Sequence, residues 1–76
     1  MTKLITNYIE GIEKLCKFYE LEHINTEIDE TPLGYLIGVR IKKDEKFLGY
    51  LQLIKKSEKN LNKMLYDFET KLKEEL

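Results

Sequence analysis

The first part of the chain repeats apolar residues at intervals of three and four positions, the spacing that lines up one face of an α-helix. These residues are Leu4, Ile5, Tyr8, Ile9, Ile12, Leu15, Cys16 and Tyr19, and charged residues fill most of the positions between them. The pattern predicts an amphipathic helix from about Thr2 to Glu22.

After His23, apolar residues alternate with polar ones, as they do in a strand that buries one face. Ile24, Thr26 and Ile28 carry this alternation and predict a strand over residues 24–29. A first helix that continues towards Glu30 is the competing interpretation. The run Thr31-Pro32-Leu33-Gly34 then suits a type I turn, because proline fixes φ at the second position.

Residues 35–42 and 46–54 form the clearest predicted hairpin, and its register depends on the length of the loop between them. A two-residue loop, Asp44-Glu45, would join the face of Ile37, Val39 and Ile41 with Leu48, Tyr50 and Gln52. A loop of odd length, such as residues 43–45, would join it with Phe47, Gly49, Leu51 and Leu53. Because the odd loop gives one cleanly apolar face for burial, we predict the odd loop, which leaves Leu48 and Tyr50 facing solvent.

The last helix is predicted from about residue 58 to residue 74, with Ser57 as its N-cap. Its apolar face consists of Leu61, Met64, Leu65, Phe68 and Leu72. Since each helix has one apolar face, we expect both helices to cover the same face of a three-stranded antiparallel meander. The predicted fold is a single α+β domain over residues 1–76, with the order helix, three strands, helix.

The composition is that of one small folded domain, because 76 residues leave room for one core and 42% of them are hydrophobic. The single cysteine, Cys16, excludes an intramolecular disulfide. No apolar run reaches the roughly 20 residues of a membrane span, and the first residues lack the apolar run of a signal peptide. We therefore expect a cytoplasmic protein without membrane contact, and a homodimer as a means of burying more surface.

Charge is unevenly distributed, although the net charge is only −1. Residues 1–33 contain three basic and seven acidic side chains, residues 34–63 eight basic and three acidic, and residues 64–76 two basic and four acidic. A helix that begins near residue 58 would align Lys56, Lys59 and Lys63 on one ridge, beside Lys55. Such a ridge suits contacts with phosphate groups, although surface lysines also serve solubility.

Residues that perform catalysis or bind metals are nearly absent. Zinc sites need three or four Cys, His or carboxylate ligands, and the chain has one cysteine and one histidine. Cys16 lies on the apolar face of the first predicted helix, where it serves as a small hydrophobic residue. His23 falls at a helix–strand junction with no evident partner to orient it. We therefore expect no enzyme activity, no catalytic or metal-binding residues and no cofactor.

The order of elements and two short runs resemble a double-stranded-RNA-binding domain. The runs are Phe47-Leu48-Gly49-Tyr50 in the hairpin and Lys55-Lys56-Ser57-Glu58-Lys59 at the entry to the last helix. The similarity is a weak one of topology, and it implies that Lys55, Lys56 and Lys59 bind phosphate groups. In place of the small residues of that family's last helix, this chain has Leu61, Met64, Leu65 and Phe68.

The outward face of the predicted sheet offers a different site. The odd-loop register leaves Leu36, Leu48 and Tyr50 beside Arg40 on that face, and Tyr66 lies off the apolar face of the last helix. Apolar and tyrosine side chains inside a charged rim are typical of protein–protein contacts.

These patterns lead to two hypotheses of function. The favoured one is a non-enzymatic protein-binding module, a small regulator or inhibitor of the kind that mobile elements encode, which occupies the surface of a protein partner. Its interface would consist of Leu36, Arg40, Leu48, Tyr50 and Tyr66. The alternative is a nucleic-acid-binding domain that uses Lys55, Lys56, Lys59 and Lys63.

Overall fold

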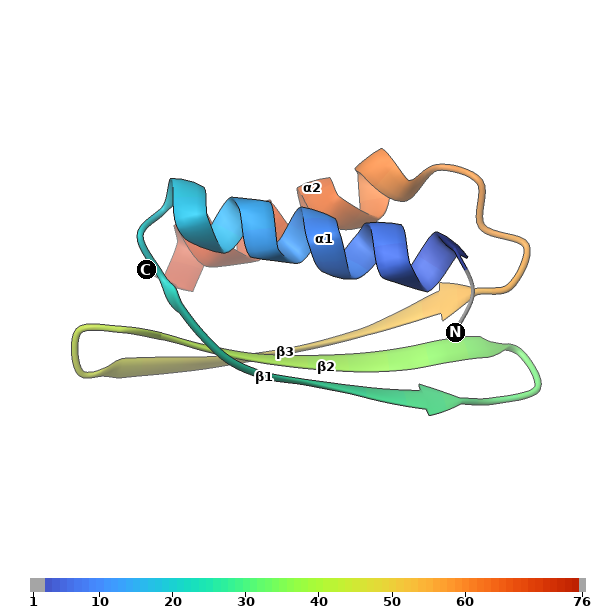
Figure 1. Ribbon diagram of the computed structural model, residues 1–76, viewed down its shortest axis with the longest axis horizontal. Coiled ribbons are helices and arrows are strands. Elements are labelled where there is room, and N and C mark those ends of the chain that lie inside the picture. The colour runs from blue at the N-terminus through green and yellow to red at the C-terminus, as the bar shows by residue number, and fades with distance from the viewer. Residues whose placement is uncertain (1–2, 76) are drawn as a thin grey trace.

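The computed structural model describes residues 3–75 and has the predicted order of elements. They are helix α1 (Lys3–Phe18), strands β1 (Glu22–Glu30), β2 (Gly34–Lys43) and β3 (Lys46–Lys55), and helix α2 (Leu61–Glu75). Figure 1 shows the strands in one layer and both helices in a second layer on the same face. The predicted α+β fold is thus confirmed, while the predicted helix start at Thr2 lies outside the described residues.

Helix α1 ends at Phe18, earlier than predicted, in a C-terminal motif that depends on Glu20. The Leu21 amide donates to the Cys16 carbonyl at 2.7 Å, and the Glu20 amide donates to the Lys17 carbonyl at 3.2 Å. This is the Schellman pattern, and Glu20 adopts its left-handed conformation with a φ of 57°. The chain therefore reverses here, and β1 begins at Glu22 instead of a helix that continues towards Glu30.

The sheet is an antiparallel meander in which β2 is the central strand. The pairing of β1 with β2 is irregular between His23 and Asn25, and Ile24 at this point is exposed. The turn from β1 to β2 lies where the sequence predicts it. It is closed by the Gly34 amide, which donates to the Thr31 carbonyl at 3.3 Å, and by the Thr31 amide, which donates to the Gly34 carbonyl at 2.7 Å.

The hairpin of β2 and β3 has the two-residue loop, so the predicted odd loop is wrong. Lys43 pairs with Lys46 across Asp44-Glu45. Asp44 has a φ of 57°, the left-handed conformation that a two-residue hairpin loop needs at its first position. The turn therefore sets the register, with Leu48, Tyr50 and Gln52 towards the helices and Phe47, Gly49, Leu51 and Leu53 on the opposite face.

Helix α2 begins at Leu61 because Asn60, and not Ser57, caps it. The Asn60 side-chain oxygen Oδ1 accepts a hydrogen bond from the Lys63 amide at 3.2 Å. The Glu58 oxygen Oε1 accepts one from the Asn60 amide at 2.8 Å, which orders the residues before the helix. Ser57 lies in the connection between β3 and α2.

The hydrophobic core lies between the sheet and the two helices. Its buried side chains are Ile5, Tyr8, Ile12 and Cys16 of α1, Tyr35, Ile37, Val39 and Ile41 of β2, Ile54 of β3, and Phe68 and Leu72 of α2. The helices approach closely at Gly11, where a Cβ atom would lie 2.5 Å from Cδ1 of Leu65. Every strand residue of this core points towards the helices, so the opposite face of the sheet contributes no side chain to it.

Candidate protein-binding site

One face of the sheet has no helices on it, and we call it the outer face (Figure 1). Strand alternation and register assign to it Glu22, Asn25, Glu27 and Asp29 of β1, Leu36, Gly38, Arg40 and Lys42 of β2, and Phe47, Gly49, Leu51 and Leu53 of β3. These side chains stand on hydrogen-bonded strands, so the ladder holds their spacing.

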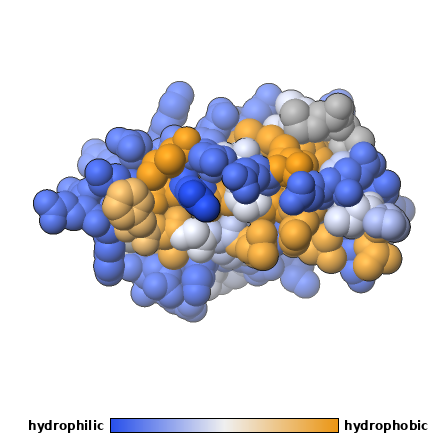
Figure 2. Space-filling model, turned by 90° about the horizontal axis from the view of Figure 1, so that it is seen from below, coloured by the Kyte–Doolittle hydropathy of each residue, from blue (hydrophilic) through white to orange (hydrophobic). Residues whose placement is uncertain are grey.

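Large apolar side chains are exposed along the β3 side of the outer face. Phe47 is 69% exposed, Leu51 68% and Leu53 40%, and Leu36 is half-buried beside Leu53. Figure 2 views the molecule from this side and shows apolar side chains gathered in a band, with polar side chains around and between them. Exposed apolar side chains gathered on one face of a small protein make that face a candidate binding site.

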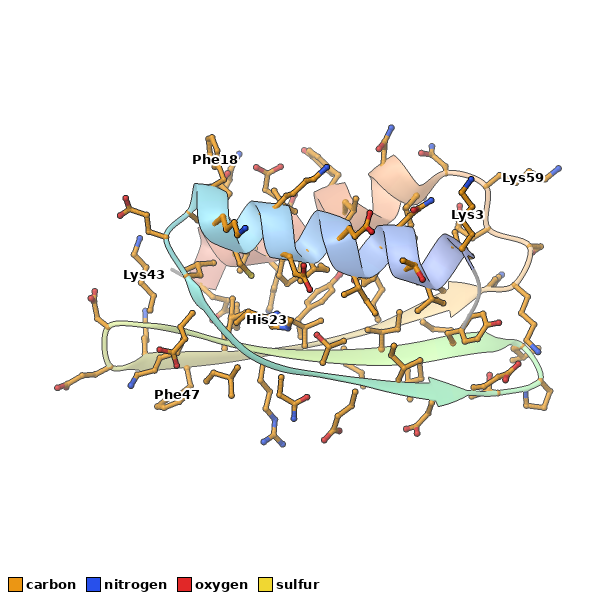
Figure 3. The ribbon with its side chains drawn as sticks, in the orientation of Figure 1. Lys3, Phe18, His23, Lys43, Phe47 and Lys59 are labelled. Atoms are coloured by element: carbon orange, nitrogen blue, oxygen red, sulfur yellow. The ribbon has the colours of Figure 1, made fainter. Side chains whose placement is uncertain are left out.

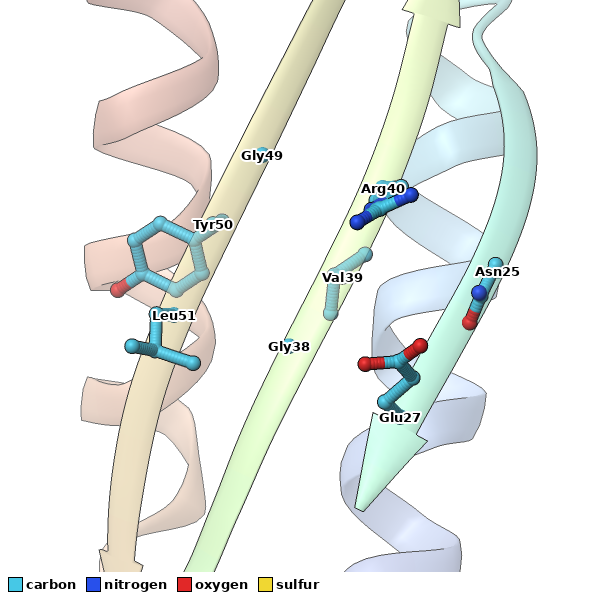
Figure 4. Close-up of a pocket in the computed structure, with 8 residues that line it drawn as sticks. All are labelled: Asn25, Glu27, Gly38, Val39, Arg40, Gly49, Tyr50 and Leu51. Atoms are coloured by element: carbon cyan, nitrogen blue, oxygen red, sulfur yellow. The ribbon is translucent and has the colours of Figure 1, made fainter. Parts of the chain in front are cut away.

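The middle of the outer face is hollow because two glycines stand there. Gly38 and Gly49 line a depression of about 250 Å³, walled by Arg40, Glu27 and Leu51 among others (Figure 4). A Cβ atom added to Gly49 would meet no atom within 4 Å, and one added to Gly38 would lie 3.7 Å from Cδ1 of Leu51. The depression therefore has room for a side chain of another molecule.

Charge changes across the outer face from one strand to the next. Strand β1 contributes the carboxylates of Glu22, Glu27 and Asp29, the central strand contributes Arg40 and Lys42, and β3 contributes the apolar side chains of Phe47, Leu51 and Leu53. The Lys42 ammonium lies 5.3 Å from the centre of the Phe47 ring, a cation–π contact. Arg40 is exposed and has no ion-pair partner among residues 3–75, so its guanidinium is free for a partner.

The structure places two of the five residues of the predicted interface on the outer face and the other three elsewhere. Leu36 and Arg40 lie on the outer face, as predicted. Leu48 and Tyr50 point the other way, because the two-residue loop reverses the predicted register: Leu48 packs against the core, and the Tyr50 ring meets the edge of Phe68 with centroids 5.3 Å apart. Tyr66 is 66% exposed on α2, in the helical layer and away from the outer face.

Sequence reasoning missed Phe47, Leu51 and Leu53 as exposed residues. Their alternation is present in the sequence, but it predicts burial because the face they form is more apolar than the face of Leu48, Tyr50 and Gln52. The signal that could have found them is Asp44-Glu45, since aspartate tolerates the left-handed conformation that two-residue hairpin loops use.

The lysines of the alternative site are spread over several elements. Lys55 is the last residue of β3, and Lys59 lies in the connection before α2 and extends into solvent (Figure 3). Lys56 forms an ion pair of 3.1 Å with Glu30 and lies 5.9 Å from the centre of the Tyr35 ring. Because α2 begins at Leu61, only Lys63 belongs to the helix, and the predicted helical ridge is wrong. Phosphate binding by these lysines stays a prediction.

Partly buried polar side chains form hydrogen bonds with one another. The Tyr8 hydroxyl donates to Oε1 of Gln52 at 2.6 Å, and the Tyr19 hydroxyl donates to Oε2 of Glu69 at 2.5 Å. Burial, with smaller contributions from Tyr50 and Asp67, raises the pKa of Tyr8, and the bond to Glu69 is the main cause of the raised pKa of Tyr19. Among the described residues no buried side-chain nitrogen or oxygen lacks a hydrogen-bond partner.

Cys16 and His23 have the local surroundings of structural residues. Cys16 is buried in the core, and burial, followed by the charge of Glu13, raises the pKa of its thiol. A raised pKa keeps the thiol protonated and less nucleophilic. The His23 nitrogen Nε2 lies 2.6 Å from Oγ1 of Thr26, on the inner face of the sheet (Figure 3).

Within residues 3–75 there is no candidate metal site and no helix that could span a membrane. No group of three or more His, Cys, Asp or Glu side chains in this part of the chain is placed to hold a metal ion. Neither of its two helices is long and apolar enough to cross a membrane. Comparison with known proteins gives no match: no family model, no curated protein and no solved structure is significantly similar to the chain.

Proposed function

We propose that the protein is a non-enzymatic protein-binding module that uses the outer face of its sheet. The observation that carries the proposal is the exposure of Phe47, Leu51 and Leu53 on a face that no helix covers. In water such side chains gain free energy when a partner covers them, at about 25 cal/mol per Å² of apolar surface removed from solvent. We further propose that the protein acts in the cytoplasm as a small regulator or inhibitor, by occupying its partner's surface, and that it forms a homodimer.

Three features of the outer face support this function. Its centre combines apolar side chains with Arg40, a residue type enriched in the energetically important parts of protein interfaces. The carboxylates of β1 flank the apolar side chains with charge, as polar rims do in protein–protein contacts. The depression over Gly38 and Gly49 supplies a place for a partner's side chain.

The test is capture of partners from lysate of the source cells with the tagged protein, with and without nuclease, followed by mass spectrometry. We expect a protein partner that survives nuclease and is lost from the variants Phe47→Ser and Leu51→Ser. Phe18→Ser is the matched control, because Phe18 is 76% exposed but lies on the helical side of the molecule (Figure 3).

Two outcomes would contradict the proposal. One is a partner that binds the Phe47→Ser and Leu51→Ser variants as well as it binds the native chain, while far-UV circular dichroism shows all variants folded. The other is a set of partners that disappears with nuclease, which would support nucleic-acid binding through Lys55, Lys59 and their neighbours. Nothing in the placement of these lysines favours that second function, since they share no single element.

A further inference from the structure

We propose that the outer face packs against the outer face of a second copy of the chain, related by a two-fold axis that runs parallel to the strands between β2 and β3. The proposal rests on the proposed function, because it names the occupant of the same face.

Such an axis has a simple consequence for pairing. It places each outward residue of β2 over one β3 residue of the second copy. That β3 residue is the one that lies across from the β2 residue within a single chain. Within one chain these neighbours are Arg40 with Gly49, Gly38 with Leu51, and Leu36 with Leu53. The same three pairs would therefore recur between the two copies.

The two central pairs are complementary in size. Each joins a long side chain to a glycine, and the space above Gly49 is open, with no atom within 4 Å of a Cβ position. The stem of Arg40 from the second copy fits this space. Leu51 lies against Gly38 of its own chain, on the side where the axis passes, so the two copies of Leu51 would meet there. Because each sheet is twisted, the match holds best near the middle, where both glycines lie.

Charge disfavours two other axes. An in-plane axis perpendicular to the strands would stack the carboxylates of β1, including Glu27 and Asp29, on those of the second copy. An axis directly above β2 would place Arg40 over Arg40. The axis between β2 and β3 avoids the stack of carboxylates, sets the two Arg40 side chains on opposite sides of the axis, and leaves the β1 carboxylates at the solvent-exposed rim, beyond the β3 edge of the second copy.

The size of the face predicts a weak association. With this axis only β2 and β3 of the two copies overlap, so two strands spaced at about 4.8 Å and about eight residues at about 3.4 Å give a contact of roughly 10 by 27 Å. Two such faces bury on the order of 700 Å² of accessible surface, below the usual size of specific interfaces. We therefore expect a dimer that dissociates on dilution, with a dissociation constant in the micromolar range or above.

The test is sedimentation velocity from about 10 μM to about 1 mM protein, a range that brackets a weak dimer. The native chain should shift from monomer to dimer over this range. Gly49→Gln places a side chain in the open space above β3, where a Cβ atom meets nothing within 4 Å, so the dissociation constant should rise about tenfold or more. Arg40→Gly should weaken the dimer in the same way, because it removes the side chain that fills this space.

The double variant Arg40→Gly with Gly49→Gln moves the long side chain to β3 and the open space to β2. It should therefore restore most of the native association. Circular dichroism establishes that each variant is folded. Three results would each overturn the inference. They are a native chain that stays monomeric, a dissociation constant that Gly49→Gln leaves unchanged, and a double variant that dimerises as weakly as the single variants.

The two proposals fail separately. If the native chain is monomeric but Phe47→Ser still abolishes capture of a cellular protein, the second copy is the wrong occupant and the proposed function stands. If the dimer behaves as expected but no other protein is captured, the inference stands and the regulator function fails.

Discussion

Within residues 3–75, two residues other than glycine, Glu20 and Asp44, adopt left-handed backbone conformations, and both lie where the chain reverses direction. For residues with a Cβ atom this conformation costs roughly 1–2 kcal/mol, whereas glycine adopts it without that strain. Glu20 allows the Schellman motif that ends α1, and Asp44 allows the two-residue loop that sets the hairpin register. Two single residues thus determine where two elements begin and end.

The first prediction concerns Glu20. Glu20→Gly should raise the free energy of unfolding by about 0.5–1 kcal/mol, because glycine relieves the backbone strain at the end of α1. Glu20→Ala is the matched control: it removes the same carboxylate but keeps the strain, so it should give no comparable gain. Urea denaturation followed by circular dichroism measures both, and equal stabilities for the two variants would contradict the prediction.

The second prediction concerns the bond between Tyr8 and Gln52. Tyr8→Phe should lower the free energy of unfolding by about 1–2 kcal/mol near neutral pH, because Oε1 of Gln52 loses its donor in a partly buried site. Tyr66→Phe, at an exposed position of α2, is the control and should change little.

The same pair predicts a pH dependence. The pKa of Tyr8 is raised in the folded state, so the unfolded chain loses this proton first, at its ordinary pKa of about 10. The stabilising contribution of Tyr8 is therefore complete below about pH 10 and declines as the pH rises further. The difference between the native chain and Tyr8→Phe should shrink above that pH in urea denaturation, and a constant difference up to the onset of alkaline unfolding would argue against this account.

At the scale of elements, the turns tolerate fewer residue types than the strands they connect. A Cβ atom at Gly34 would lie 2.2 Å from the carbonyl oxygen of Ile54, which is backbone and cannot rotate away. We predict that Gly34→Ala lowers the free energy of unfolding by about 2 kcal/mol or more, because β2 and β3 must separate locally. Gly49→Ala, on an open part of the same hairpin, should be neutral or slightly stabilising. Thermal unfolding of the two variants measures the contrast, and similar losses would contradict it.

The elements themselves could be predicted from the sequence because their apolar residues are periodic. The stripe of Ile5, Tyr8, Ile12 and Cys16 predicted α1, and the alternation around Ile37 and Val39 predicted the central strand. The ends of the helices could not be predicted equally well, because they depend on single backbone conformations and caps. Asn60 and Ser57 are both acceptable caps by residue type, and only the hydrogen bonds in the structure distinguish them.

The register of β3 shows why the candidate site was only partly predictable. The sequence pattern predicts that the more apolar face of β3 is buried. The structure buries the other face, where Gln52 is satisfied by the Tyr8 hydroxyl and the Tyr50 ring packs on Phe68. Turn geometry at Asp44 outweighed hydrophobicity. Arg40 and Leu36 were identified because their strand was placed correctly, while the apolar residues of β3 were assigned to the wrong face.

At the scale of the whole molecule, the two sides differ in how they expose apolar groups. On the helical side, Phe18 lies at the end of α1 against Tyr19, and Tyr66 stands on α2. On the sheet side, Phe47, Leu51 and Leu53 follow one strand and adjoin the depression at Gly49. Scattered exposed apolar residues are ordinary in folded proteins, whereas several on one strand beside a hollow are typical of a contact surface.

The most direct test of this account is a dilution series of amide nuclear magnetic resonance spectra on the native chain, from about 1 mM to about 20 μM, a range that spans a weak association. The account predicts concentration-dependent shifts on β2 and β3, centred on Gly38, Arg40, Gly49 and Leu51, with unchanged signals around Phe18 and Tyr66. Shifts that centre on the helices, or spectra that do not change with concentration, would contradict it.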